Sequence, residues 1–182
     1  METIALFGGS FDPPHIGHKA VVDGVLKIKD VKKVIIMPTF LNPFKTKSHA
    51  PAQLRLKWLR DIFSGYKNVE VSSWEVEQNK KVPTIQTVLH LLESYKKIYL
   101  VIGADNLSSL KQWDRFEELE KLVSIVVASR DGIVIEENFI TLDINHNISS
   151  TSLREDIQKA KLPKTCAKEI EKFYKENNAK QN

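Results

Sequence analysis

The sequence predicts an α/β protein built on a single doubly wound parallel sheet, with helices on both faces and a helical segment at the C-terminus. Short apolar runs of strand length alternate with amphipathic stretches of helix length along the chain. Glycine-rich or polar segments follow the apolar runs, as they do at the carboxyl ends of parallel strands. The chain has 182 residues without repeats, a low-complexity segment or a linker, so we expect one domain spanning residues 1–182.

The first half of the chain predicts three strands and two helices. Buried strands are continuous apolar runs, and both helices carry apolar side chains three and four residues apart. The expected order is a strand at 4–7, a helix at 16–29, a strand at 34–37 that ends at Pro38, a helix that begins at Pro51, and a strand at 69–76. The polar segment 39–49 is expected to be a loop, and Trp58 and Trp74 are interpreted as core residues.

The second half repeats the alternation. The expected order is a helix at 84–95, a strand at 97–102 that ends at Gly103, a helix at 113–122, a strand at 124–128 and a short strand at 141–144. Four hydroxyl residues at 149–152 are typical of a helix N-cap. They precede C-terminal helices at 152–178, which Pro163 divides and which we assign to the same domain.

Composition excludes several classes of protein. The net charge is +4 with a pI of about 9.0, but the lysines are spread along the chain and no basic stripe contains aromatic residues, so no nucleic-acid partner is expected. No signal peptide is recognisable, and no apolar run reaches the roughly 20 residues that cross a membrane. Cys166, the single cysteine, is interpreted as a small buried hydrophobe. We therefore expect a cytoplasmic protein without a membrane partner, either monomeric or a simple homo-oligomer.

The densest candidate site is Gly8-Gly9-Ser10-Phe11-Asp12-Pro13-Pro14-His15-Ile16-Gly17-His18, directly after the first strand. Gly8 and Gly9 allow a ligand to approach the backbone closely. His15 and His18 stand three residues apart at a helix start, so their rings point to one side. Free N–H groups there favour phosphate, and imidazole donors stabilise charge that grows during phosphoryl transfer. Taken alone, the segment fits a phosphate site and a plain turn about equally.

Other phosphate and metal motifs are missing from the sequence. The chain has no Walker A loop and no GxGxxG, which removes the main support for a dinucleotide oxidoreductase. No cysteine cluster or HExxH pattern accompanies the two histidines, so no protein-held metal is expected, and Asp12 is interpreted as a turn residue.

The second candidate site is Ile148-Ser149-Ser150-Thr151-Ser152-Leu153-Arg154. Hydroxyl groups and N-terminal amides suit triphosphate oxygens, and Arg154 lies one turn into the helix, where it can neutralise a leaving pyrophosphate. The alternative is a capping run followed by a surface arginine.

Four further positions lie after predicted strands or in loops. Asp105 follows a buried strand, where its carboxylate can accept from a ribose or cap a helix. Trp113 can stack on a flat ring or pack in the core. Lys45 lies in the 39–49 loop, where it can contact a phosphate or belong to a mobile surface loop. Arg130 follows the strand at 124–128 and suits a phosphate.

Together these segments resemble the nucleotidylyltransferase superfamily, which carries an (H/T)xGH motif after its first strand and an SSTxxR-like motif before a C-terminal helix. Within it, the chain is similar to bacterial nicotinate-nucleotide adenylyltransferases over nearly its whole length. The motifs are GGSFDPPHIGH at 8–18, PTFLNPFK at 38–45, TIQT at 84–87, IGADNL at 102–107, Trp113-Asp114, and ISSTSLR at 148–154.

The resemblance implies a Rossmann-like nucleotidylyltransferase fold and in-line attack of a mononucleotide phosphate on the α-phosphorus of ATP, with Mg²⁺ as the expected cofactor. It implies catalytic roles for His15, His18 and Arg154. The implied ATP-binding residues are Gly8, Gly9, Ser10, Phe11, His15, His18, Gly103, Asp105, Ile148, Ser149, Ser150 and Arg154. The implied nicotinate-mononucleotide-binding residues are Asn42, Lys45, Thr84, Trp113, Asp114 and Arg130.

The product implied is nicotinate adenine dinucleotide, with release of pyrophosphate, in NAD biosynthesis. In the family, backbone amides at the positions of Thr84 and Asp114 hold the nicotinate carboxylate. This chain departs from the family's Ser-Tyr-Thr run, because it has Val82-Pro83-Thr84. Three alternatives stay open: nicotinamide mononucleotide as acceptor, another phosphate acceptor such as phosphopantetheine, and a non-catalytic nucleotide-binding regulator.

Overall fold

The computed structural model describes residues 2–144 and 148–179. Within them, six strands form one sheet in the order β3-β2-β1-β4-β5-β6, and every pairing is parallel. The strands are β1 (Thr3–Gly9), β2 (Lys33–Pro38), β3 (Val69–Val71), β4 (Lys97–Gly103), β5 (Val123–Ala128) and β6 (Ile140–Leu142). The predicted doubly wound parallel sheet is therefore confirmed.

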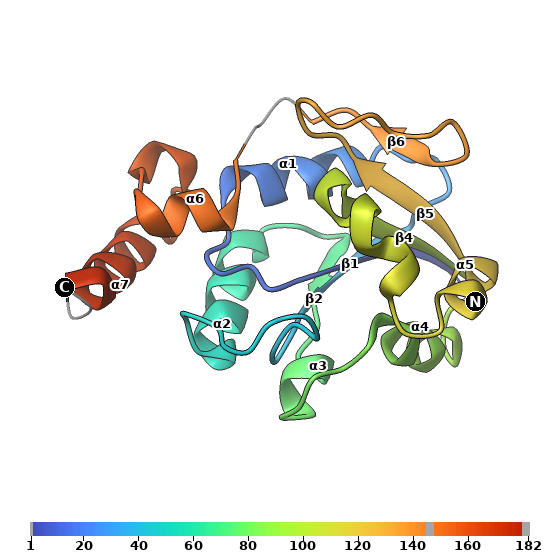
Figure 1. Cartoon of the computed structure of the whole chain (residues 1–182), viewed down its shortest axis with the longest axis horizontal. Coiled ribbons are helices and arrows are strands. Elements are labelled where there is room, and N and C mark those ends of the chain that lie inside the picture. The colour runs from blue at the N-terminus through green and yellow to red at the C-terminus, as the bar shows by residue number, and fades with distance from the viewer. Residues whose placement is uncertain (1, 145–147, 180–182) are drawn as a thin grey trace.

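Helices cover both faces of the sheet, and the C-terminal helices lie at one end of the long axis, shown in red in Figure 1. The α-helices are α1 (Ile16–Val25), α2 (Ala52–Phe63), α3 (Trp74–Glu77), α4 (Thr84–Leu92), α5 (Phe116–Leu122), α6 (Ser150–Glu155) and α7 (Ala167–Ala179). Two 3-10 helices, η1 (Ala104–Gln112) and η2 (Lys159–Lys161), complete the described elements.

Alternate residues of each central strand feed two separate cores. On β1, Ala5 and Phe7 pack with α1, α2 and α7, whereas Ile4 and Leu6 pack with α4, η1 and α5. Because successive strand side chains point to opposite faces, an uninterrupted apolar run is needed to fill both cores. The apolar strands predicted from the sequence have this property.

The strand order reverses between β1 and β4, since β2 and β3 extend the sheet on one side and β5 and β6 on the other. In open parallel sheets, ligands bind beyond the carboxyl ends of the strands at such a switch point. The Gly8–His18 segment follows β1, and Gly103 ends β4. Both predicted motifs therefore flank the same crevice.

Two predicted elements around α3 and α5 were wrong in part. The strand predicted at 69–76 ends at Val71, because the Ser72 hydroxyl accepts from the Trp74 N–H at 3.2 Å and the chain turns into α3. The helix predicted at 113–122 begins only at Phe116, since Arg115 is left-handed with φ of 51°. Residues 104–112, where no helix was predicted, form η1.

Other boundaries shift by a few residues. The helices predicted at 16–29 and 84–95 end at Val25 and Leu92, and β6 covers Ile140–Leu142 instead of 141–144. The last turn of a helix commonly tightens, so that an N–H donates to the carbonyl three residues earlier instead of four. The Ile28 N–H donates to the Val25 carbonyl in this way, at 3.0 Å.

The C-terminal helices predicted over 152–178 are α6, η2 and α7, and Pro163 lies between the last two. α6 begins two residues earlier than predicted, since the Ser149 hydroxyl caps the Ser152 N–H at 3.0 Å. Leu153, Ile170 and Tyr174 belong to the core that also holds α1 and α2. These helices therefore share the core of one sheet face.

The interpreted core residues are buried with one exception. Trp58 is 0% exposed and Cys166 is 3% exposed, as predicted. Trp74 is only partly buried and stacks on His90 of α4, with ring centroids 4.4 Å apart.

Candidate active site

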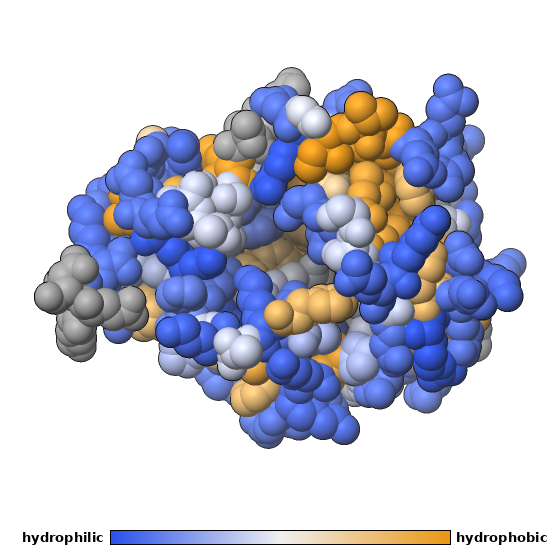
Figure 2. Space-filling view, viewed as in Figure 1, coloured by the Kyte–Doolittle hydropathy of each residue, from blue (hydrophilic) through white to orange (hydrophobic). Residues whose placement is uncertain are grey.

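A cavity of about 610 Å³ lies at the carboxyl ends of β1, β2, β4 and β5. Figure 2 shows the molecule hollowed near the middle of the face that is viewed. Every predicted site residue except Arg154 lines this cavity. These residues are Gly8, Gly9, Ser10, Phe11, His15, His18, Asn42, Lys45, Thr84, Gly103, Asp105, Trp113, Asp114, Arg130, Ile148, Ser149 and Ser150.

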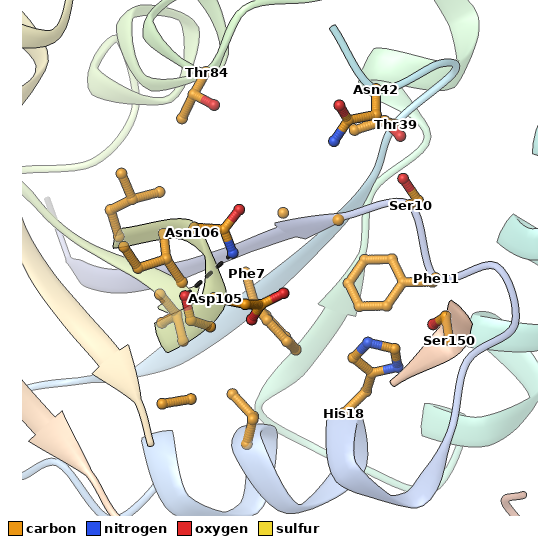
Figure 3. A pocket seen from close by; sticks show the side chains of 18 of the residues that line it. Phe7, Ser10, Phe11, His18, Thr39, Asn42, Thr84, Asp105, Asn106 and Ser150 are labelled. Carbon is orange, nitrogen blue, oxygen red and sulfur yellow. Dashed lines mark hydrogen bonds between the residues drawn. The ribbon is translucent and has the colours of Figure 1, made fainter. Parts of the chain in front are cut away.

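His15 and His18 stack on each other at one end of the cavity. Their ring centroids are 3.6 Å apart, and the backbone N–H of His15 donates to Nδ1 of His18 at 3.2 Å. The ring of Phe11 meets His18 edge-on at 4.9 Å. Figure 3 shows His18 on α1 beside Phe11 and Ser150. The (H/T)xGH-like segment therefore fixes the orientation of one imidazole.

The protonation state of His18 follows from these contacts. The ring is partly open to the cavity but lies deep among neighbouring atoms, and this burial lowers its pKa well below the ordinary value, with His15 and Arg130 lowering it further. A neutral imidazole that accepts at Nδ1 carries its proton on Nε2. His18 is therefore a neutral donor through Nε2.

The backbone before the histidines is shaped by the ring of Phe11. Phe11 has a left-handed φ of 49° and is 3% exposed. A Cβ on Gly9 would lie 3.2 Å from that ring, closer than side chains normally approach, whereas a Cβ on Gly8 would meet nothing nearer than 3.9 Å. A side chain at Gly9 would therefore require the ring of Phe11 to shift by a few tenths of an ångström, whereas a side chain at Gly8 would meet only ordinary contact.

The second motif meets the first at this end of the cavity. The hydroxyl of Ser150 donates to the carbonyl of Pro13 at 2.9 Å, across 137 residues of sequence. Ser149 is engaged in capping α6. The two segments singled out in the sequence therefore form one wall.

Arg154 lies outside the cavity lining. Its guanidinium donates to the backbone carbonyl of Asp12 and, at 3.0 Å, to the hydroxyl of Thr151, which does line the cavity. Arg154 thus lies next to the predicted phosphate wall and stabilises the Gly8–His18 segment from outside the cavity.

Arg130 and Asp105 lie at the carboxyl ends of β5 and β4. Arg130 donates to the carbonyl of Ile148 at 2.7 Å and lies 3.6 Å from a carboxylate oxygen of Asp105. A Cβ on Gly103 would lie 2.6 Å from Oδ1 of Asp105, so a larger residue at this position would require the Asp105 side chain to move. The dashed line in Figure 3 marks the bond from Asn106 to Gly103, at 3.2 Å.

The remaining predicted residues line other parts of the cavity. In Figure 3, Thr84 at the start of α4 lies across the cavity from His18. The indole N–H of Trp113 has no hydrogen-bond partner among the described residues. Asn42 accepts from the Phe44 N–H at 2.9 Å, which shapes the 39–49 loop, and burial lowers the pKa of Lys45, with Arg154 adding to this effect.

Asp12 was interpreted as a turn residue, but it is 2% exposed and holds three segments together. Its carboxylate accepts from the N–H groups of His49 and Ala50, at 2.8 and 3.0 Å, and from the hydroxyl of Tyr174. Burial raises the pKa of Asp12, but these three hydrogen bonds and the charge of Arg55 lower it overall.

Sequence reasoning missed Arg55 and Glu75. Arg55 is 0% exposed and donates to the carbonyls of Ser10, Phe40 and Ala50, at 2.6, 2.9 and 3.1 Å. Glu75 is 5% exposed and lines the cavity. Arg55 could have been found from the sequence, because it is a charged residue on the apolar face of a predicted helix. Glu75 could not, because it lay in a segment predicted to be a strand.

No helix within the described residues has the length and apolar composition to cross a membrane. In the same parts of the chain, no group of three or more His, Cys, Asp or Glu side chains is arranged to hold a metal ion.

Comparison with known proteins identifies the family. A family model described as Cytidylyltransferase-like matches residues 6–156. A protein of Sulfurimonas denitrificans named "Probable nicotinate-nucleotide adenylyltransferase" is 63% identical over 180 residues, covering 99% of each chain. One of the same name from Campylobacter fetus is 46% identical, covering 97% of this chain and 99% of that one.

A solved structure has the same fold. It is the nicotinic acid mononucleotide adenylyltransferase of Plasmodium falciparum complexed with NaAD, with a TM-score of 0.73 and 20% identity, covering 100% of this chain and 97% of that one. The chain therefore belongs to the cytidylyltransferase-like family, within its nicotinate-nucleotide adenylyltransferases.

Proposed function

We propose that this chain transfers the AMP part of ATP to the phosphate of nicotinate mononucleotide, giving nicotinate adenine dinucleotide and pyrophosphate. The observation that carries the proposal is one continuous cavity with two different ends. The end at α1 and α6 offers donors for phosphate oxygens, and the end at α4 and Trp113 offers an aromatic ring and helix N-terminal amides. The names of the relatives favour the same reaction.

The reaction needs no protein nucleophile. An oxygen of the acceptor phosphate attacks the α-phosphorus of ATP, a new P–O bond forms, and the bond to the β-phosphate bridging oxygen breaks as pyrophosphate leaves with its electron pair. Such transfer depends on positioning and on stabilising charge. His18 donates through Nε2–H to an α-phosphate oxygen. His15 holds the His18 ring in position through ring stacking and a backbone hydrogen bond to Nδ1.

The α6 segment is proposed to bind the β- and γ-phosphates through Ser149, Ser150 and Arg154. The guanidinium of Arg154 has five N–H donors, and the carbonyl of Asp12 and the hydroxyl of Thr151 engage two of its nitrogens. Among the described residues, no other group accepts from its remaining donors, which lie beside Thr151 in the cavity lining. Ile148, Gly8, Gly9, Ser10 and Phe11 complete the ATP wall.

The adenosine ribose is assigned to Gly103 and Asp105, because a carboxylate accepts well from ribose hydroxyls. The acceptor nucleotide is assigned to the opposite end, with Trp113 stacking on the pyridine ring and the backbone amides of Thr84 and Asp114 binding its carboxylate. Asn42, Lys45 and Arg130 are assigned to its phosphate.

Removing Mg²⁺ with a chelator is expected to lower pyrophosphate release by roughly 10² or more, since a metal supplies several kcal/mol of charge stabilisation. Mg²⁺ keeps several of its waters and binds through phosphate oxygens, so it enters here as part of the substrate MgATP. Added Mg²⁺ should restore the rate, and full activity in excess chelator would contradict this assignment.

The proposed function is tested by comparing pyrophosphate release with nicotinate mononucleotide and nicotinamide mononucleotide at one pH. We expect kcat/KM to be higher for the nicotinate form by roughly tenfold or more, because a charged acceptor repays N–H donors better than a neutral amide. Equal rates would be consistent with the proposed reaction but would reject the assignment of the nicotinate carboxylate to the backbone amides of Thr84 and Asp114.

Release of pyrophosphate with phosphopantetheine, and with neither pyridine nucleotide, would show that nicotinate mononucleotide is not the acceptor. ATP binding without release in any mixture would favour a non-catalytic regulator. The cytoplasmic location, the absence of nucleic-acid and membrane partners, and a homo-oligomeric state stay predictions from the sequence.

A further inference from the structure

Glu75 of α3 is a buried acid in the cavity wall with one oxygen unused. Its Oε1 accepts from the Thr87 hydroxyl at 2.6 Å, and its Oε2 is buried without a hydrogen-bond partner among the described residues. The side chain is 5% exposed and lines the cavity. A buried polar oxygen without a partner costs free energy, so this arrangement favours a ligand that supplies one.

Glu75 lies at the acceptor end of the cavity. Thr84 and Thr87 stand three residues apart on α4, so they share one face of that helix, and both line the cavity. The bond to Thr87 therefore brings the carboxyl group beside the first turn of α4. Figure 3 shows that this turn, marked by Thr84, lies opposite His18 and Ser150.

The segment that leads into α4 adds little to this wall. Val82 and Pro83 lead into α4 and line the cavity, and Pro83 has no N–H to offer. A carboxyl group is unusual among side chains because protonation changes it from an acceptor into a donor. Glu75 is thus a side chain of this wall whose protonation switches it between a donor for an anionic ring substituent and an acceptor for a neutral one.

We propose that Glu75 recognises the substituent on the pyridine ring of the acceptor nucleotide through a hydrogen bond. As the neutral acid it donates from Oε2 to a ring carboxylate, and as the carboxylate it accepts from a ring carboxamide. The proposal rests on the proposed function and adds a specificity-determining residue to it. It makes the choice between nicotinate and nicotinamide nucleotides depend on pH.

The electrostatic environment of Glu75 allows this change near neutral pH. Burial raises the pKa of Glu75 to about 7, and the hydrogen bond from Thr87 lowers it, with no charged neighbour among the influences. Charged and titratable groups do occur on the elements packed against α3 and in the cavity. On the packed elements they are His90 on α4, Arg55, Lys57, Arg60 and Asp61 on α2, Lys33 on β2, and Glu77 on α3. Around the cavity they are His15, His18, Lys45, Asp105, Asp114 and Arg130.

Several of these groups have partners elsewhere. His90 stacks on Trp74, Arg55 donates to three carbonyls, and Lys33 pairs with Glu70 at 3.1 Å. Lys57 bonds Asp61 and Glu169, and Glu77 accepts from Ser73.

The test measures kcat/KM for nicotinate mononucleotide and for nicotinamide mononucleotide from about pH 5.5 to about pH 8.5. It follows the ratio of the nicotinate value to the nicotinamide value. The two acceptors share the ribose and the phosphate, so titration of the phosphate and of the cavity histidines cancels in the ratio. In the wild type we expect the ratio to fall by roughly tenfold or more as the pH rises through about 7.

Glu75→Gln is the matched variant, because it keeps the shape and an acceptor for Thr87 but does not titrate. Its ratio is expected to stay constant across the same pH range. A flat ratio in the wild type, or the wild-type slope retained in Glu75→Gln, would overturn the proposal. A merely structural role would change both KM values together and leave no pH dependence in the ratio.

Thr87→Val supplies a second measurement. It removes the donor that lowers the pKa of Glu75, so the midpoint of the ratio should move to higher pH. An unmoved midpoint would also reject the role of Glu75. Release with neither acceptor at any pH contradicts the proposed function itself, whereas release with a flat ratio contradicts only this inference.

Discussion

Replacing His18 with alanine is expected to lower kcat for pyrophosphate release by roughly 10² to 10³, as removal of one preorganised donor to a developing charge does. His18 reaches the cavity as a neutral donor, with Nδ1 engaged by the backbone N–H of His15. The donor is therefore present before the reaction begins and needs no proton from solvent.

The expected change is in kcat more than in KM, because the bond strengthens as charge grows on the α-phosphate. Steady-state kinetics of pyrophosphate release provide the measurement, with circular dichroism to check the fold. His90→Ala is the matched control, since His90 lies outside the cavity lining and its side chain is 42% exposed. Wild-type kcat in His18→Ala would reject the mechanism.

Replacing Asp12 with alanine is expected to lower the free energy of unfolding by about 3–5 kcal/mol, the usual cost of removing one partner from a buried charged network. The change leaves the N–H groups of His49 and Ala50 and the hydroxyl of Tyr174 without their acceptor. It also leaves the buried Arg55 without its nearby negative charge.

Tyr174→Phe removes a single bond of this network and should cost less, about 1–3 kcal/mol. Denaturant unfolding of both variants measures the difference. Because the pKa of Asp12 is lowered in the folded protein, its stabilisation is present above the ordinary value of 3.8 and is lost as pH falls through the lowered value. A loss below about 1 kcal/mol in Asp12→Ala would contradict the role of Asp12 in joining these segments.

The difference between predicted and observed elements has a local cause. The apolar runs of β1, β2, β4 and β5 were recognised because each fills two cores with consecutive residues. The Trp74 helix was missed because it has only four residues and begins at the turn at Ser72, which is too short a segment for periodicity to reveal. η1 was missed because a 3-10 helix does not have the 3.6-residue period of an α-helix.

The site divides in the same way. Residues in the Gly8–His18 and Ile148–Arg154 motifs could be assigned to phosphate binding, because glycine, histidine and hydroxyl residues next to helix starts have a recognisable chemistry. The sequence could not show where the Arg154 side chain points, because its hydrogen bond to the Asp12 carbonyl joins residues 142 positions apart.

By itself, the sequence determined the parallel sheet, the order of its elements and the two motifs that meet at the switch point, because these depend on neighbouring residues. Only the tertiary structure decided that His18 is a neutral donor, that Asp12 bonds Tyr174 across 162 positions, and that Glu75 has a buried oxygen in the cavity wall. Burial and hydrogen bonding set these properties, and both arise from residues that are far apart in the chain and close only after folding.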